Sequence, residues 1–238
     1  MTAQLADSAI ALTDVKFGWP DQPALLSIDQ FRLLPGERLF LYGASGSGKT
    51  TLLNLLAGVL VPDKGNIELL GRPFSQCTSQ QRDQVRADHL GFIFQVFNLL
   101  PYLSLLDNVL LPCRFSVRRA SRARQRFGSE EAAARYLLST LGLSDPALFK
   151  RPVIELSVGQ QQRVAAARAL IGEPELIIAD EPTSALDSDM RETFIELLDS
   201  QVTHSGSALL FVSHDLSLAT GFSRSLSLAE LNSASTVV

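Results

Sequence analysis

The chain has 238 residues, of which 46% are hydrophobic, and a formal net charge of −4. This length allows one domain with a substantial core, or a large domain with a subdomain, and the negative charge argues against a general nucleic-acid binder. No stretch approaches the roughly 20 apolar residues that a membrane-spanning helix needs, and the N-terminal residues do not resemble a signal peptide. Cys77 and Cys113 lack metal-type spacing. We therefore expect a cytosolic protein that would need a partner for any role at a membrane.

The first part of the chain alternates between apolar runs and turn-rich segments. This pattern predicts helices from residue 51 to about 58–62 and over 78–88, with strands at 10–17, 25–34, 38–42, 66–70 and 90–94. Such an arrangement favours a mixed α/β sheet with a ligand site at the carboxyl end of a strand.

From about residue 95 to 159 the strand-like runs disappear, and helices are predicted at 103–110 and 130–141. Strands are predicted again at 176–179 and 208–212, with a helix at 188–201 between them. Residues 222–230 are serine-rich, and we expect residues 231–238 to form a short polar tail without an added regulatory domain.

A glycine-rich segment between a predicted strand and a predicted helix fits the phosphate-loop pattern G-x-x-x-x-G-K-[ST]. Glycines let successive backbone N–H groups point at an anion, and the helix N-terminus adds partial positive charge. Lys49 is expected to reach the β- and γ-phosphates, and the Thr50 hydroxyl to bind Mg²⁺. A chance Gly/Ser-rich turn is disfavoured by the flanking elements. The expected nucleotide-binding residues are Gly43, Ala44, Ser45, Gly46, Ser47, Gly48, Lys49, Thr50 and Thr51.

The predicted strand at 176–179 is followed by two acids, Asp180 and Glu181. Beside a phosphate loop, Mg²⁺ needs a nearby carboxylate, and Asp180 is the candidate. Glu181 is the candidate base that polarises the attacking water, the alternative being a solvated loop acid.

Three further stretches resemble the ATP-binding subunits of ABC transporters, and the resemblance runs from about residue 10 to about 220. They read LSVGQQQR at 156–163, DEPTSALD at 180–187 and SHD at 213–215. The resemblance implies a P-loop NTPase (RecA-like) core with an antiparallel β subdomain, at about 1–94 and 160–238. It also implies a helical signature subdomain at about 95–159.

The resemblance also implies roles for single residues. Trp19 takes the place of the aromatic residue that stacks on adenine; the alternatives are a ring packed on the sheet, or Phe17 in that role. Gln95 matches the glutamine that contacts Mg²⁺ and the attacking water, and His214 matches the histidine that contacts the γ-phosphate. The other two histidines, His89 and His204, have no motif around them and are expected at the surface.

In this family, Ser157, Gly159 and Gln160 open a helix that faces ATP held by a second copy, which implies a homodimer around two ATP molecules. Val158 stands where a glycine is usual, and we expect it to be tolerated unless the backbone there is strained. Asp187 matches a loop that couples the two sites.

Residues 90–112 resemble one bacterial subgroup, the lipoprotein-release, macrolide-export and cell-division ATPases. Their aromatic and leucine cluster fits a groove for a coupling helix of an integral membrane permease, the alternative being a core seam. The resemblance thus implies a peripheral subunit on the cytoplasmic face of the inner membrane. Other readings are a soluble ABC-type ATPase acting in regulation or on nucleic acid, and a scaffold that does not hydrolyse ATP.

Six arginines crowd one short stretch of the predicted helical region. A solvated helix face is the ordinary interpretation, and contact with anionic lipid is the sharper hypothesis. They are Arg114, Arg118, Arg119, Arg122, Arg124 and Arg126.

Overall fold

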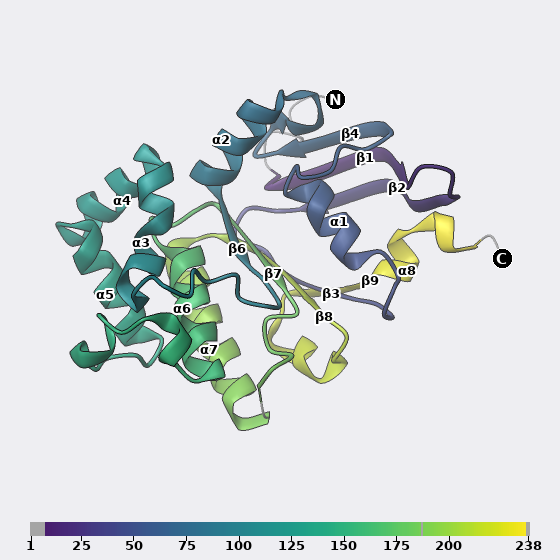
Figure 1. Ribbon diagram of the computed structural model, residues 1–238. Coiled ribbons are helices and arrows are strands. Elements are labelled where there is room, and N and C mark those ends of the chain that lie inside the picture. Colours follow the sequence, from purple (N-terminus) through teal and green to yellow (C-terminus); the bar gives the residue numbers. More distant parts are fainter. Residues whose placement is uncertain (1–7, 187, 237–238) are drawn as a thin grey trace. The chain divides into compact units, whose positions relative to one another are not determined.

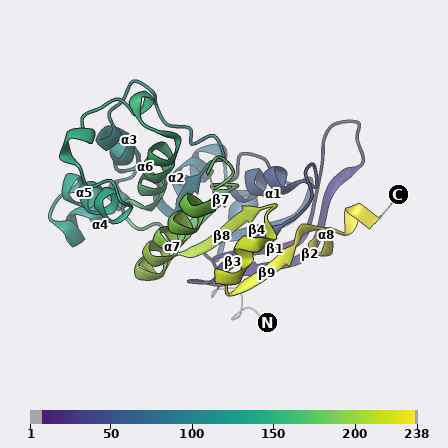
Figure 2. The same cartoon turned by 90° about the horizontal axis from the view of Figure 1, so that it is seen from below.

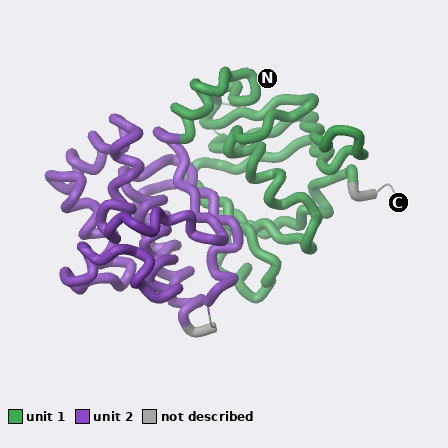
Figure 3. Tube along the Cα trace, viewed as in Figure 1, with its two compact units in different colours: residues 1–86, 208–238 green, residues 87–207 purple. Residues whose placement is uncertain are grey.

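The computed structural model describes residues 8–186 and 188–236, which fall into two compact units (Figure 3). Unit 1 combines the residues up to 86 with those from 208 onward, and unit 2 is the continuous stretch 87–207. Unit 1 holds an antiparallel sheet, and parallel strands and helices occur in both units. The α/β class predicted from the sequence is confirmed.

The antiparallel sheet of unit 1 has the strand order β2-β1-β4-β5 (Figure 1). Its strands are β1 (Ile10–Gly18), β2 (Ala24–Leu33), β4 (Lys64–Leu69) and β5 (Arg72–Pro73). Their apolar side chains are buried, which fixes the pairing register because a slip by one residue would turn them to solvent. The buried set in β1 and β2 includes Ile10, Leu12, Val15, Leu26, Ile28 and Leu33.

A second group of strands in unit 1 is parallel. β3 (Arg38–Tyr42) lies between β8 (Ala208–Ser213) and β9 (Arg224–Ser227), and Figure 2 shows β3 and β9 side by side. β3 and β8 are apolar and largely buried, as expected of parallel strands covered on both faces. The serine-rich stretch 222–230 therefore contains a strand, β9, that the sequence pattern did not predict.

The C-terminal segment is bound to the sheet, which corrects the expectation of a polar tail. After α8 (Leu228–Leu231), the Asn232 side chain is 1% exposed. Its Oδ1 accepts a hydrogen bond from the Ser27 backbone N–H at 2.7 Å, and its Nδ2 donates to the Leu25 carbonyl at 2.9 Å. The carboxamide thus pairs with β2 as a neighbouring strand would.

The remaining helices of unit 1 are short. α1 (Lys49–Leu56) ends just before Gly58, whose φ of 66° lets the chain leave the helix. α2 (Ser79–His89) begins in unit 1 and ends in unit 2. The 3₁₀ turns here are Phe74–Gln76, Leu216–Gly221 and Ser233–Thr236.

Unit 2 is mainly helical, and α3, α4, α5 and α6 pack against one another (Figure 1). Its helices are α3 (Leu105–Phe115), α4 (Val117–Phe127), α5 (Glu130–Thr140), α6 (Val158–Leu170) and α7 (Ser188–Ser205), with 3₁₀ turns at Pro146–Leu148 and Val153–Glu155. β6 (Leu90–Ile93) and β7 (Leu176–Asp180) form a parallel pair. The helical character predicted for 95–159 is confirmed.

Two details of unit 2 differ from the sequence pattern. The helix predicted at 103–110 begins at Leu105 and continues through Pro112 to Phe115. In addition, unit 2 holds β6, β7 and α7 besides the central helices, so the division into a core and a helical subdomain at 95–159 remains a prediction. Within 8–186 and 188–236, the structure has no helix long and apolar enough to cross a membrane.

Candidate functional site

The phosphate loop of unit 1 connects β3 to α1, as predicted. Gly46 and Gly48 have φ values of 78° and 98°, a region that side-chain-bearing residues rarely adopt. The loop is closed by the Ser47 backbone N–H, which donates to the Ala44 carbonyl at 3.2 Å. Two positive-φ glycines within three residues curl the backbone around the N-terminus of α1, which is the geometry that an anion requires.

The lysine of this loop is held in place by the loop itself. Lys49 is 7% exposed, and its Nζ donates to the carbonyls of Gly43 at 2.8 Å and Ala44 at 3.0 Å. The ammonium group is therefore already positioned over the loop.

Other groups of the loop are suited to bind phosphate. The N-cap of α1 is Gly48, which offers no side-chain oxygen to its first N–H groups, and the Ser47 Oγ is buried without a hydrogen-bond partner. A buried hydroxyl in that position is costly unless a ligand satisfies it. Thr50 is exposed and Thr51 half-buried at the start of the helix.

His214 lies at the same sheet edge as the phosphate loop. Tyr42 at the end of β3 pairs with Ser213 at the end of β8 in a parallel ladder. The next residues, Gly43 and His214, therefore leave the two strands at the same edge, and His214 is exposed there. The structure thus brings together two of the predicted groups that the sequence separates by more than 160 residues.

Trp19 borders an open groove in unit 1. Its ring is 45% exposed and contacts Phe17 edge-to-face, with 5.3 Å between the ring centroids. Phe17 is 6% exposed, so Trp19 is the more accessible of the two candidate adenine platforms. The groove has a volume of about 600 Å³, and Val59, Val61 and Asp63 also line it.

In unit 2, the predicted metal ligands and base follow a pair of parallel strands. Ile93 of β6 pairs with Ala179 of β7, so the residues just beyond them lie at one edge. Asp180 ends β7, and Glu181 follows with a φ of 44°. A left-handed backbone is unusual for glutamate and is typical of functional sites. Gln95 is exposed at this edge, two residues after β6.

The signature segment opens α6, as the resemblance implied. Ser157 is the N-cap, and it forms a capping box: the Gln160 backbone N–H donates to Ser157 Oγ at 3.3 Å, and the Ser157 N–H donates to Gln160 Oε1 at 3.0 Å. Val158 is the first residue of the helix and is 48% exposed, so valine carries no backbone strain here. Gln160 supports the helix end from within the chain.

Among the described residues, none of the neighbours of Gly159 requires a glycine at this position. It is helical, and an added Cβ would lie 3.4 Å from the Met190 Sδ, with no closer neighbour among the described residues. That is ordinary van der Waals contact. A small residue at this position is therefore explained better by something that approaches the helix end from outside.

Sequence reasoning missed two polar residues of α6. Gln162 is 1% exposed, and its Nε2 donates to the Pro182 carbonyl, just after Glu181. Arg168 donates to two carbonyls of the segment after Gln95. Their partners lie 20 to 71 residues away along the chain, so no local pattern could have revealed them. Asp187, the predicted coupling residue, lies outside the described residues.

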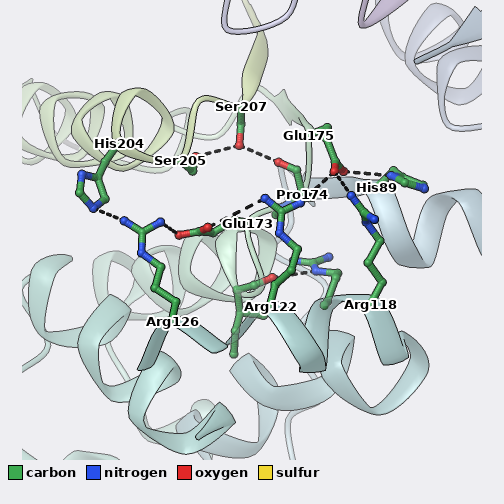
Figure 4. Close-up of polar contacts among 12 residues, drawn as sticks. His89, Arg118, Arg122, Arg126, Glu173, Pro174, Glu175, His204, Ser205 and Ser207 are labelled. Carbon is green, nitrogen blue, oxygen red and sulfur yellow. Dashed lines mark hydrogen bonds and ion pairs between the residues drawn. The ribbon is translucent and has the colours of Figure 1, made fainter. Parts of the chain in front are cut away.

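The arginine-rich stretch forms α4 and its flanks, and most of its side chains are paired within unit 2 (Figure 4). Arg118 and Arg122 pair with Glu175, and Arg126 pairs with Glu173. The remaining ion pairs are Arg124 with Glu130 and Arg114 with Asp107.

Arg119 is 3% exposed and donates to backbone carbonyls, among them Ile171 at 2.7 Å and Ala169 at 2.6 Å. These carbonyls end α6, so the guanidinium caps the C-terminus of that helix. Burial lowers the pKa of Arg119 to about 10, which leaves it charged at neutral pH.

The expectation that His89 is a surface residue is wrong. Its ring is 7% exposed, and its Nδ1 lies 2.9 Å from Glu175 Oε2 (Figure 4). His204 is exposed, as expected, and contacts Arg126.

The placement of the predicted site residues can be stated for each unit. In unit 1, the phosphate loop and His214 follow the carboxyl ends of the neighbouring strands β3 and β8, and Trp19 lies beside a groove. In unit 2, Gln95, Asp180 and Glu181 lie at the carboxyl ends of the paired strands β6 and β7. Ser157–Gln160 form the N-terminus of α6. Within the described residues, no three His, Cys, Asp or Glu side chains cluster as a metal site would.

Comparison with known proteins agrees with this arrangement. The family model described as ABC transporter matches residues 26–184. The lipoprotein-releasing system ATP-binding protein LolD of Pseudomonas fluorescens is 41% identical over 211 residues, which are 89% of each chain. The uncharacterized ABC transporter ATP-binding protein YbbA of Escherichia coli is 43% identical over 193 residues, or 81% of each chain.

A solved structure is similar over nearly the whole chain. It is a dimer of the ATP-binding cassette MJ0796 in a post-hydrolysis state, bound to ADP and Pi. It is 32% identical, with a TM-score of 0.79, and the match covers 92% of this chain and 93% of that one. The chain therefore belongs to the ABC transporter family, as an ATP-binding subunit that hydrolyses ATP.

Proposed function

We propose that this protein hydrolyses ATP as a homodimer closed around two nucleotides and thereby drives a separate integral membrane permease. The observation that carries the proposal is the N-terminus of α6, where the described neighbours of Gly159 leave room for a side chain yet the residue has none. A glycine in that position suits close approach of a second copy's nucleotide, since helix N-termini bind phosphate. The MJ0796 cassette, which is dimeric with ADP and Pi bound, supports the same arrangement.

We assign the roles within each half-site as follows. The phosphate loop and Lys49 hold the β- and γ-phosphates, Trp19 stacks on adenine, and His214 contacts the γ-phosphate. Glu181 accepts a proton from the attacking water; it directly follows β7 and has a left-handed backbone. The proposal requires the groups of both units to act on one ATP molecule, as the family resemblance implies.

Thr50, Asp180 and Gln95 would hold Mg²⁺, which neutralises charge on the phosphates when it is bound. The chemistry of each residue by itself suits a magnesium ligand. Thr50 is exposed at the start of α1, and Asp180 is a single carboxylate at a strand end. Mg²⁺ in nucleotide sites keeps several waters and needs only one or two protein carboxylates besides the phosphates, so a larger acidic cluster is not required.

The permease would bind unit 2 through a groove of about 260 Å³. Val96, Phe97, Leu99 and Ile154 line it, and Val96 and Ile154 are 80% and 70% exposed. Exposed apolar side chains around a groove suit an amphipathic helix, which supports the coupling-helix prediction. By analogy with LolD, whose name places it in a lipoprotein-releasing system, we propose work on membrane-anchored cargo. The protein would then be peripheral on the cytoplasmic face of the inner membrane.

Contact with anionic lipid through Arg114–Arg126 stays a prediction. The ion pairs of α4 with Glu173 and Glu175 compensate much of its charge, which supports the alternative of an internally paired helix. Neutralising Arg114 and Arg124, the more exposed arginines, should lower binding to anionic vesicles relative to neutral vesicles if the prediction holds. Equal binding would refute it. Nucleic acid is not an expected partner, because the net charge of −4 does not favour binding to a polyanion.

Glu181→Gln tests the catalytic half of the proposal. This variant should bind ATP, form a stable dimer on size-exclusion chromatography, and lose roughly 10²-fold or more of its turnover, as expected when a general base is removed. Glu192→Gln, an exposed acid on α7, is the matched control and should behave as the wild type. Wild-type turnover by Glu181→Gln would refute the assignment.

A charged side chain in the groove lined by Val96 and Ile154 tests whether this groove binds the permease. Ile154→Asp should abolish co-purification with a membrane protein while ATP binding persists. Leu34→Asp replaces an exposed leucine of unit 1 that lines neither this groove nor the Trp19 groove, and it should leave co-purification intact. If both variants retain the partner, the groove is not the permease site.

A further inference from the structure

The side chain of Arg168 reaches from α6 to the segment that follows Gln95. Its Nη2 donates to the Phe97 carbonyl and its Nη1 to the Asn98 carbonyl, each at 2.6 Å. Both distances are short, and hydrogen bonds from charged donors are shorter than those from neutral ones. Burial lowers the pKa of Arg168 to about 10, so the guanidinium is still charged at neutral pH and keeps both donors.

The segment held in this way has an unfavourable backbone conformation. Phe97 and Asn98 have φ values of 55° and 48°, so two successive residues with side chains are left-handed. Few non-glycine residues adopt this region, and such strain persists only where surrounding contacts impose it. The two bonds from Arg168 fall on the carbonyls of these two residues.

Phe97 also closes the turn that carries Gln95. The Phe97 backbone N–H donates to the Phe94 carbonyl at 3.1 Å and closes a turn that has Gln95 and Val96 at its centre. Farther along, the fully buried Asn108 of α3 holds Leu100: its Oδ1 accepts from the Leu100 N–H at 2.8 Å. The loop is therefore fastened by α6 just after the turn and by α3 at its far end.

We propose that Arg168 is a positioning residue for hydrolysis, which holds the turn that carries Gln95 in shape from the signature helix. This inference rests on the proposed function, in which Gln95 contacts the attacking water. It adds a physical link within unit 2 between the helix opened by Ser157 and the glutamine loop. Lysine cannot replace Arg168, because a single ammonium on a flexible side chain does not present two fixed donors as the planar guanidinium does.

Hydrogen exchange of the full-length protein, followed by mass spectrometry, tests the contact. In Arg168→Gln, exchange of peptides spanning 94–99 should rise by roughly 10- to 100-fold, since two charged hydrogen bonds are lost and opening is local. Arg168→Lys should fall between this variant and the wild type. Arg135→Gln on α5 is the control: it loses an exposed pair with Glu131 and a cation–π contact with Phe149, neither of which involves residues 94–99, and it should leave these peptides unchanged.

Steady-state hydrolysis of Mg·ATP tests the consequence. We expect kcat of Arg168→Gln to fall by about 10-fold while KM for ATP changes less than about twofold, because the loss concerns a group that acts in the transition state. If Arg168→Gln merely made the protein less stable, we would not expect a specific fall in kcat with a loosened loop at 94–99.

Several results would overturn the proposal. These are unchanged exchange at 94–99, an equal rise in exchange across all of unit 2, a loosened loop with unchanged kcat, or full recovery by Arg168→Lys. Failure of the proposed function itself would be seen in the wild type, as a protein that does not bind or hydrolyse Mg·ATP. The exchange result would stand in that case, so the two failures are distinguishable.

Discussion

Glu175 holds together the polar network between α4 and the segment before β7, and its replacement by glutamine is the sharpest test of unit 2 (Figure 4). The carboxylate lies 2.9 Å from His89 Nδ1, accepts from Arg122 Nη1 at 2.8 Å, and is also paired with Arg118. Burial alone would raise its pKa, but hydrogen bonds from His89, Arg118 and its own backbone N–H prevail and lower the pKa from 4.5 to about 2.

The lowered pKa of Glu175 gives the stability that the folded protein should lose in Glu175→Gln. One pKa unit corresponds to about 1.4 kcal/mol, so a fall from 4.5 to about 2 sets an upper bound near 3 kcal/mol. The side chain is 28% exposed, and solvent screening reduces this value. We expect Glu175→Gln to lower the free energy of unfolding at pH 7 by about 2 kcal/mol.

Urea unfolding of both proteins across a pH series measures this difference. Because the folded-state pKa is depressed, the stabilisation is complete above about pH 4.5 and is lost as the pH falls toward 2. The difference between wild type and variant should therefore stay constant from pH 8 to pH 5 and shrink below that. Glu131→Gln removes an exposed i,i+4 pair on α5 and should cost at most about 0.5 kcal/mol. Equal costs for the two variants at pH 7, or a difference that already shrinks above pH 5, would refute the reasoning.

Three further outcomes are expected. Gly65→Ala should lower the free energy of unfolding by several kcal/mol, because the new Cβ would lie 2.2 Å from the Asp14 carbonyl oxygen. Gly128→Ala has open space around the new Cβ and should lower it by only about 1 kcal/mol, and thermal unfolding compares the two variants. The thiol of Cys113, whose pKa burial raises to about 11, should react with a thiol reagent at pH 8 only after unfolding, while Cys77 reacts in the native protein. Ser157→Ala should destabilise the protein by about 1 kcal/mol through loss of the capping box, measured by urea unfolding; an unchanged midpoint would contradict the cap.

Motifs and apolar runs predicted most of the fold from the sequence. β3, β7 and β8 are nearly continuous apolar runs, and each is followed by a residue to which the sequence motifs assign a role. β9 escaped prediction because an edge strand with serines at alternate positions lacks the apolar pattern on which strand prediction depends. Its pairing with β3 becomes evident only when the two are placed side by side.

Burial of polar residues could not be predicted from local patterns. His89 is buried because Glu175, 86 residues later, lies against its ring. Arg119 lies in a run of arginines that suggests a solvated helix face, yet it is the one whose partners are carbonyls at the end of α6. In both cases the stabilising group is distant in the sequence and has no motif of its own. Long-range hydrogen bonds of this kind decide burial, and a residue's neighbours along the chain do not record them.

The discontinuous make-up of unit 1 has a consequence for how the protein is synthesised. β3 is made early, but its two neighbours come from residues 208–227, near the end of the chain. Unit 2 is continuous, so all of its residues have been synthesised once residue 207 is reached, whereas the two partner strands of β3 follow only after that residue. A chain that stops before residue 208 therefore leaves both edges of β3 unpaired, next to the phosphate loop. We expect such a truncated chain to be bound by chaperones or degraded by proteases before it can bind ATP.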